Sequence, residues 1–134
     1  LMMVGLDGEE TSVFDETLNF LVENKVSILK LFTPAPYPGT EFHAKMQKEG
    51  RILHEDWGRY DYGGVIVSPT AMSPQDLMGG FVRTYRSFYS LSNIARRMLP
   101  LPPKNYVETA AYMVANLKCN RYLARRPEMW GTIS

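Results

Sequence analysis

Cysteine is nearly absent from this sequence, since Cys119 is the only one among 134 residues. One thiol cannot form an intramolecular disulfide, and it cannot supply the ligand set of a structural zinc or iron-sulfur site. Long apolar runs are also missing, because none approaches the roughly 18 residues that a membrane-spanning helix requires. No charged start followed by an apolar stretch marks a signal peptide. These absences predict a cytoplasmic protein in a reducing compartment, without a membrane span.

Net charge is also small, at +1, but it hides an asymmetry along the chain. Residues 1–80 hold 12 acidic and 6 basic side chains, whereas residues 81–134 hold 9 basic and 2 acidic ones. This split predicts that the basic half lies against the acidic half or is simply solvated. Binding of nucleic acid through the basic tail is a weaker alternative, because the tail carries no recognition motif. We therefore expect no nucleic-acid partner.

The start of the chain shows the order strand, helix, strand. The apolar run LMMVG at residues 1–5 leads into a polar turn at residues 6–9, which predicts a buried strand ending in a loop. Ser12 followed by Asp15 resembles a capping box. The next apolar side chains fall at helical spacing, namely Phe14, Leu18, Leu21 and Val22. Residues 26–32, VSILKLF, predict a second strand, and a helical crossover of this kind joins parallel neighbours.

Proline and glycine dominate the next segment. TPAPYPGT at residues 33–40 contains three prolines and one glycine, which predicts a stiff loop. Thr40 is placed to cap a short helix that ends at Gly50. Residues 51–72 are loop-like except for VIVS at residues 65–68, which predicts an edge strand stopped by a proline. We expect three aromatic side chains to pin this segment to the body of the protein: Trp57, Tyr60 and Tyr62.

The second half of the chain predicts two long helices. Ser73, with a proline next and Asp76 three residues on, is a strong helix start, and the pattern runs to Met98 before PLPP ends it. The apolar stripe of this helix is Leu77, Phe81, Tyr85 and Phe88. The arginines offset from that stripe predict a solvated face, and they are Arg83, Arg86 and Arg97. A last helix over residues 105–122 carries Val107, Ala111, Val114 and Leu117.

Groupings that could carry chemistry are scarce. His43 and His54 stand apart in the sequence with no cysteine near either, so surface or helix-capping histidines are favoured over a metal pair. Asp7, Glu9 and Glu10 could serve acid-base chemistry or a cation, but compensation of the helix dipole is the simpler interpretation. No catalytic residue and no metal ligand is predicted in this chain.

Several motifs nevertheless occur in the same order as in a known protein superfamily. MVGLDGEE, a capped helix and then ILKLFTPAPYPGTEFHAKMQKEGRI resemble the last two β/α steps of the partial barrel of the radical S-adenosylmethionine (radical SAM) superfamily. DWGRYDYGGVIVSPTAMSPQDL with FVRTYRSFYS is similar to the tail of the cobalamin-binding class, often labelled magnesium-protoporphyrin monomethyl ester cyclase-like. The resemblance covers most of residues 1–90. It implies an α/β fold in which residues 1–50 are the last two β/α units of a partial barrel and residues 51–134 a mainly helical C-terminal extension.

The site that the resemblance implies consists of positioning residues. Gly5 and Gly8 match the turn whose backbone lies near the adenine of S-adenosylmethionine, and Val4 and Leu6 would line that pocket. The loop after the next strand would face the same barrel mouth and the substrate, because barrel sites lie at the carboxyl ends of strands. Its substrate-facing residues would be Thr33, Tyr37, Gly39 and Thr40.

The resemblance also implies parts outside this chain. The superfamily holds its four-iron four-sulfur cluster with CxxxCxxC, which one cysteine cannot supply, and a cobalamin domain normally precedes the barrel. We therefore expect a C-terminal fragment of a cyclase- or methyltransferase-like enzyme, inactive alone and completed by a missing N-terminal part. The parent would use S-adenosylmethionine, the cluster and cobalamin. The main alternative is a non-catalytic interaction or dimerisation module whose aromatic helix binds a partner. The open strand edges of a fragment also predict a homodimer.

Overall fold

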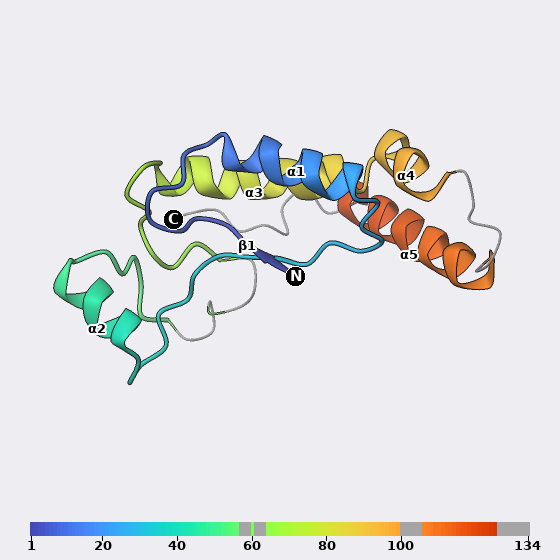
Figure 1. The fold of residues 1–134 in the computed structure, drawn as a ribbon. Coiled ribbons are helices and arrows are strands. Elements are labelled where there is room, and N and C mark those ends of the chain that lie inside the picture. Colours follow the sequence, from blue (N-terminus) through green and yellow to red (C-terminus); the bar gives the residue numbers. More distant parts are fainter. Residues whose placement is uncertain (57–59, 61–63, 100–105, 126–134) are drawn as a thin grey trace.

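The computed structural model describes residues 1–56, 60, 64–99 and 106–125. Within these residues the chain forms a small two-stranded sheet and a set of helices (Figure 1). The elements in chain order are β1 (Met2–Met3), α1 (Val13–Glu23), β2 (Leu31–Phe32), α2 (Glu41–Lys48), α3 (Pro74–Phe88), α4 (Leu91–Met98) and α5 (Tyr106–Arg125). The predicted mixture of strands and helices is confirmed, while its membership of a partial barrel stays a prediction. The predicted division of the chain near residue 50 also stays a prediction.

The two strands are parallel, as the helical crossover predicts. Met2 lies opposite Leu31 and Met3 opposite Phe32. The amide of Met2 donates to the carbonyl of Lys30 and that of Val4 to the carbonyl of Phe32, each at 2.9 Å. The regular ladder is shorter than the predicted strands over residues 1–5 and 26–32, because a ladder needs a backbone partner at every step.

The outer edge of β2 is closed by tyrosine hydroxyls rather than by another strand. The Tyr85 hydroxyl accepts from the Leu31 amide at 2.9 Å, and the Tyr89 hydroxyl accepts from the Leu29 amide at 3.3 Å. Tyr89 also donates to the Leu29 carbonyl at 3.2 Å. One hydroxyl can both donate and accept a hydrogen bond. Each tyrosine hydroxyl can therefore replace the backbone hydrogen bonds that a neighbouring strand would make. The β2 edge therefore needs no second copy of the chain, and the predicted homodimer stays a prediction.

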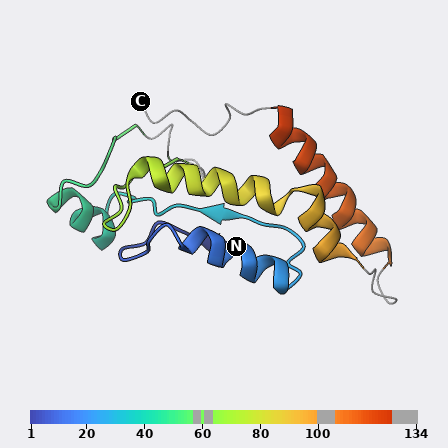
Figure 2. The ribbon, with the colours of Figure 1, turned by 90° about the horizontal axis from the view of Figure 1, so that it is seen from above.

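The core lies between the sheet and the helices α1 and α3, which pack side by side along the strands (Figures 1 and 2). Their close approach depends on Gly80, because a Cβ atom there would lie 2.1 Å from the ring of Phe14. The buried core residues are Val4, Phe14, Leu21, Leu29, Leu31, Val65, Leu77, Phe81, Phe88, Tyr89 and Leu123. In both views α2 lies at one end of the molecule and α4 and α5 at the other.

Two of the predicted helix starts are confirmed. Ser73 and Asp76 form a reciprocal capping box at the start of α3. The Thr40 hydroxyl accepts from the His43 amide at 3.1 Å and caps α2, whose end is followed by Gly50 with φ +64°. The capping box predicted at Ser12 is wrong, because Ser12 already has helical dihedral angles and makes no side-chain cap. A turn that starts at Glu10 runs directly into α1 instead.

The prediction of one helix over residues 73–98 is also wrong. α3 ends at Phe88, and α4 begins after Ser90, whose hydroxyl accepts from the Asn93 amide at 3.4 Å. Serine side chains compete with the backbone for such bonds, so a serine can break a helix that the apolar pattern would continue.

Arg97 of α4 does not lie on a solvated face as predicted. Its side chain is buried, with 3% of the residue exposed, and its guanidinium stacks on Phe88 at 3.5 Å from the ring centroid. It donates to the carbonyls of Val26 at 2.6 Å and Phe88 at 2.8 Å, and to the side-chain oxygen of Asn116 at 2.9 Å. Burial lowers the pKa of Arg97 to about 10. Arg97 therefore ties the end of α3 and the loop after α1 to α5.

The last helix is confirmed in the described range Tyr106–Arg125, but the predicted apolar stripe is not the face by which it packs. Val107 is 86% exposed and Val114 53% exposed, whereas Asn116 and Leu123 are buried. The side chain of Asn120 donates to the Tyr89 carbonyl at 2.7 Å. Amide side chains bonded to distant carbonyls thus fix α5 where an apolar stripe was expected.

Between α2 and α3 the predicted edge strand at residues 65–68 is reduced to one antiparallel bridge, in which Ile52 lies opposite Val67. Trp57, Tyr62 and the PLPP segment lie outside the described residues. Tyr60 is half-buried. Among the helices of the described ranges, none has the length and apolar character needed to cross a bilayer.

Candidate functional site

The turn after β1 is fixed by hydrogen bonds to its backbone amides. Gly5 has φ +90° and Gly8 φ +88°, values that side chains rarely allow. The Glu9 carboxylate accepts from the amide of Gly5 at 2.8 Å and from that of Leu6 at 3.0 Å. The Gly8 amide donates to the hydroxyl of Thr70 at 3.2 Å. We call residues Gly5 to Glu9 the glycine turn.

A second set of contacts joins the glycine turn to α2. The Asp7 carboxylate pairs with Arg51, whose two terminal nitrogens contact its two oxygens, and with Lys45 at 3.2 Å. Arg51 also donates to the Ser68 carbonyl at 2.8 Å and pairs with Glu49 at 2.9 Å. The hydrogen bond from Arg51 is the main cause that lowers the pKa of Asp7 to about 2. Asp7 is therefore an anion at neutral pH and serves as a tether.

Sequence reasoning missed this role for the acidic run. The interpretations weighed for Asp7, Glu9 and Glu10 were acid-base chemistry, a cation and dipole compensation, and none of them predicts the contacts that the structure shows for Asp7 and Glu9. Glu9 instead binds amides of its own turn, and Asp7 binds Arg51, 44 residues away. The spacing of Gly5 and Glu9 is a local signal that could have suggested the first contact. No local pattern indicates the second.

The loop after β2 is held by its polar side chains. Thr33 is buried, and its hydroxyl donates to the Gly64 carbonyl at 2.6 Å. The Thr40 hydroxyl donates to the Tyr37 carbonyl at 2.6 Å as well as capping α2. Gly39 has φ +82°, with nothing within 4 Å of the place that a Cβ would occupy. Of the predicted substrate-facing residues with a side chain, Tyr37 is 51% exposed and Thr40 is also exposed, whereas Thr33 is buried.

The glycine turn and this loop follow neighbouring parallel strands, so they leave the sheet at the same edge. Of the predicted cofactor-lining residues, Leu6 is 44% exposed, whereas Val4 is 1% exposed and packs in the core. Lys45 of α2 and Arg51, which follows α2, pair with Asp7 and so link the glycine turn to the helix that follows this loop. The structure thus places the two segments at the same edge of the sheet, with Val4 and Thr33 buried. Their contacts with a cofactor or substrate stay predictions.

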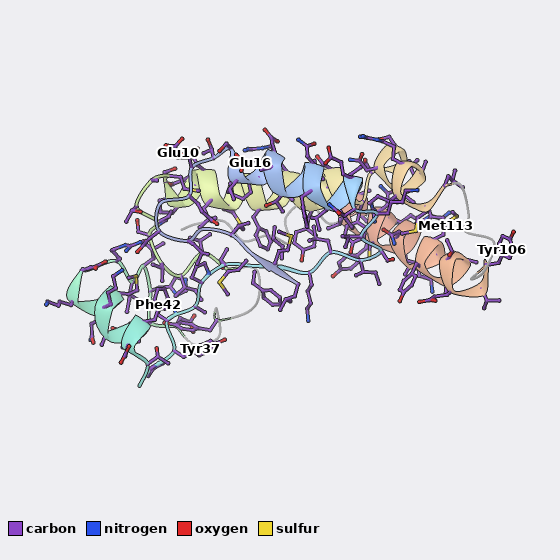
Figure 3. The ribbon with its side chains drawn as sticks, viewed as in Figure 1. Glu10, Glu16, Tyr37, Phe42, Tyr106 and Met113 are labelled. Atoms are coloured by element: carbon purple, nitrogen blue, oxygen red, sulfur yellow. The ribbon has the colours of Figure 1, made fainter. Side chains whose placement is uncertain are left out.

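Aromatic rings gather near the same loop. The rings of Tyr37 and Tyr60 have centroids 6.0 Å apart and are tilted by 58°. The His54 ring meets that of Tyr60 edge-on at 6.4 Å. Figure 3 shows Tyr37 and Phe42 at the α2 end of the molecule, opposite the end where Tyr106 lies. Within the described residues, no three His, Cys, Asp or Glu side chains gather in a way that could hold a metal ion.

Comparison with known proteins finds two bacteriochlorophyllide methyltransferases. The chain is 28% identical over 127 residues to a bacteriochlorophyllide d C-12(1)-methyltransferase of Chlorobaculum tepidum, covering 94% of this chain and 26% of that protein. It is 27% identical over 109 residues to a bacteriochlorophyllide d C-8(2)-methyltransferase of the same organism, covering 78% of this chain and 24% of that protein.

A third relative carries the name that the resemblance predicts. The anaerobic magnesium-protoporphyrin IX monomethyl ester cyclase of Cereibacter sphaeroides is 24% identical over 87 residues, covering 65% of this chain and 14% of that protein. No family model matches the chain, and no solved structure is significantly similar to it. The chain is therefore related in sequence to these methyltransferases and to this cyclase, and it spans about a quarter of the length of the methyltransferases.

Proposed function

We propose that this chain is the C-terminal part of a radical SAM enzyme that modifies a porphyrin- or chlorophyll-type macrocycle. The names of all three relatives refer to bacteriochlorophyllide or protoporphyrin. The observation that carries the proposal is the glycine turn, which is braced at the carboxyl end of β1 in a chain that resembles these enzymes over most of its length. Methyl transfer is favoured over cyclisation, because the methyltransferase matches cover more of the chain.

The glycine turn suits the adenine end of S-adenosylmethionine. Nothing lies within 4 Å of the place that a Cβ of Gly8 would occupy, so a flat ring can approach the backbone there. Leu6, which is 44% exposed, offers an apolar surface beside it. S-adenosylmethionine supplies the reactive group when bound. The residues of this chain bind and orient it, and the anionic Asp7 keeps the turn fixed through Arg51.

The iron-sulfur cluster does not fit this chain. The sequence holds one cysteine, Cys119, which lies half-buried on α5, far from the glycine turn along the chain. A four-iron cluster needs several thiolates. In the proposal the preceding part of the parent therefore holds the cluster, and this chain alone is inactive. Use of cobalamin by the parent remains a prediction of the same resemblance.

The preceding part would meet this chain at β1. The sheet order is β1-β2, so within the described residues the outer edge of β1 has no neighbouring strand. Leu1 and Met3 are 88% and 50% exposed there. Exposed strand edges with apolar side chains are normally covered. We propose that a strand of the parent pairs with this edge.

The alternative of an interaction module receives no such support. The aromatic residues of α3 that would bind a partner are used inside the protein, because Phe81 and Phe88 are fully buried and Tyr85 bonds to β2. Nucleic-acid binding by the basic tail likewise gains no supporting observation, and Arg97 is removed from the candidate surface by burial.

The direct test is on the parent protein. The reading frame that precedes Leu1 should encode CxxxCxxC, and the protein that includes it should cleave S-adenosylmethionine under reducing, anaerobic conditions. A reading frame that contains no such motif, or an intact parent with a reconstituted cluster that leaves S-adenosylmethionine uncleaved, would contradict the proposal.

A further inference from the structure

Three aromatic rings near the loop after β2 are placed in a way that the fold itself does not require. Tyr37, Tyr60 and His54 form a chain of ring contacts at 6.0 and 6.4 Å, and we call them the aromatic cluster. Tyr37 comes from the loop after β2, and His54 and Tyr60 come from the segment between Ile52 and Val67, the two residues of the antiparallel bridge. None of the three belongs to the buried core. Their arrangement is therefore not explained by the packing of the hydrophobic interior.

The aromatic cluster presents a surface as well as contacts. Tyr37 is 51% exposed, and two further apolar side chains of the neighbouring segments are exposed, Leu53 at 42% and Phe42 at 37%. Single exposed apolar residues are ordinary, but several on adjoining segments are typical of a binding surface. Figure 3 shows Tyr37 and Phe42 at the same end of the molecule.

One buried polar atom of the cluster has no partner in the described part of the chain. That atom is Nδ1 of His54. Buried polar atoms nearly always have a partner, and an exception is explained by strain, by a bound water or ion, or by a functional role. This observation is independent of the exposure of Tyr37.

We propose that the aromatic cluster is the platform on which a flat conjugated macrocycle lies, with the Tyr37 ring against its face. The inference rests on the proposed function for the macrocycle and adds the residues that contact it. Aromatic rings prefer offset or edge-to-face contacts, and the tilt of 58° between Tyr37 and Tyr60 lets Tyr60 brace Tyr37 from the side.

The position of the cluster suits this role. The loop that carries Tyr37 and the glycine turn leave the same edge of the sheet, and Asp7, Arg51 and Lys45 connect the glycine turn to α2, the helix that follows this loop. A substrate on the aromatic cluster would therefore lie on the same side of the molecule as the proposed cofactor. The contact area decides the affinity, because a larger flat ring covers more of the cluster. A smaller flat ring such as adenosine should therefore bind it much more weakly than a macrocycle.

The test is a titration of the 134-residue chain with protoporphyrin IX, followed by the shift of the porphyrin absorption band, with adenosine as competitor. Tyr37→Leu keeps an apolar side chain but removes the ring, and it should weaken binding roughly tenfold, the size of one aromatic contact. Tyr106→Leu is the matched control, because Tyr106 is 57% exposed on α5 at the other end of the molecule, and it should leave binding unchanged.

Both tyrosines are exposed, so circular dichroism should show folded protein in each variant. Equal affinities for the unsubstituted chain and Tyr37→Leu, equal losses in both variants, absence of porphyrin binding, or displacement by adenosine at similar concentrations would each overturn the inference. Binding of S-adenosylmethionine to the parent protein separates this result from the proposed function. If the parent binds S-adenosylmethionine while the chain ignores the porphyrin, only the aromatic platform fails.

Discussion

Asp7 joins two segments that are distant in the sequence, the glycine turn and the helix α2, through Arg51 and Lys45. Its carboxylate is about 40% exposed, so water and salt screen the pairs and their contribution to stability is less than about 1 kcal/mol. The larger consequence is conformational, because the same residue lies between Gly5 and Gly8. Fixing Asp7 therefore fixes the backbone that we propose to meet the cofactor.

Replacing Asp7 with asparagine should remove a pH-dependent part of the stability. The pKa of Asp7 falls from its ordinary 3.8 to about 2 on folding, mainly because of the hydrogen bond from Arg51. A lowered folded-state pKa stabilises the protein above pH 4, and this stabilisation is lost as the pH falls toward 2. Unfolding measured against pH should show Asp7→Asn less stable than the unsubstituted chain at pH 6, with a difference that shrinks as the pH falls from 4 toward 2. A difference that does not shrink over this range, or one matched by Glu10→Gln, would contradict the ion-pair explanation.

Arg97, at the other end of the molecule, is a buried charge that is held by neutral groups. Its partners in the described residues are carbonyls, the Asn116 side chain and the Phe88 ring, and its Nε atom is buried without a partner there. Arg97→Met should lower the free energy of unfolding by about 3 kcal/mol, because buried carbonyls and Asn116 lose their donor. Arg96→Met is the control on the same helix, since Arg96 is exposed, and it should change stability by less than about 0.5 kcal/mol. Denaturant unfolding measures both, and similar losses in the two variants would refute the role of Arg97.

At the scale of elements, the contact between α1 and α3 is decided by one of two adjacent glycines. A Cβ at Gly80 would lie 2.1 Å from the Phe14 ring, whereas one at Gly79 would meet only the end of the Arg83 side chain at 3.2 Å. Alanine is preferred to glycine in a helix by about 1 kcal/mol. Gly79→Ala should therefore be neutral or stabilising, while Gly80→Ala should destabilise by about 2 kcal/mol as the helices are forced apart. Thermal unfolding of the two variants checks this, and equal melting temperatures would contradict the packing described.

Features that depend on neighbouring residues could be predicted from the sequence. Ser73 with Asp76 and Thr40 before α2 mark helix starts correctly, because a cap binds amides three residues away. The same reasoning failed at Ser90, where a cap signal competed with an uninterrupted apolar pattern. Strand lengths could not be predicted, because the edge of β2 is completed by Tyr85 of α3 and by Tyr89, the residue that follows α3.

The residues of the candidate site also divide into those that the sequence could predict and those that it could not. Gly5 and Gly8 could be found from the turn that they form, and both adopt the positive φ expected of such glycines. Arg51 could not, because its partner Asp7 lies 44 residues away. The aromatic cluster could not be found either, since Tyr37 and Tyr60 meet only through the folded loop. Side chains that act across long sequence separations leave no periodic signal.

At the scale of the whole molecule, the chain spans about a quarter of the length of the methyltransferases that it matches. In our proposal the remainder of a longer parent continues the sheet at the outer edge of β1, which has no neighbouring strand within the described residues. The glycine turn and the aromatic cluster would then contribute positioning surfaces to a site whose reactive groups come from elsewhere. Stability of the chain and activity of the parent should accordingly respond to different substitutions.

Binding of S-adenosylmethionine to the parent protein, measured by calorimetry, tests this division most directly. Gly8 and Gly50 both have positive φ and open space where a Cβ would lie, but only Gly8 belongs to the glycine turn. Gly8→Ala should weaken binding roughly tenfold, because the added methyl group blocks close approach to the backbone, while Gly50→Ala should leave it unchanged. Equal affinities for both variants and the unsubstituted parent, or a parent that does not bind S-adenosylmethionine, would contradict the proposed role of the glycine turn.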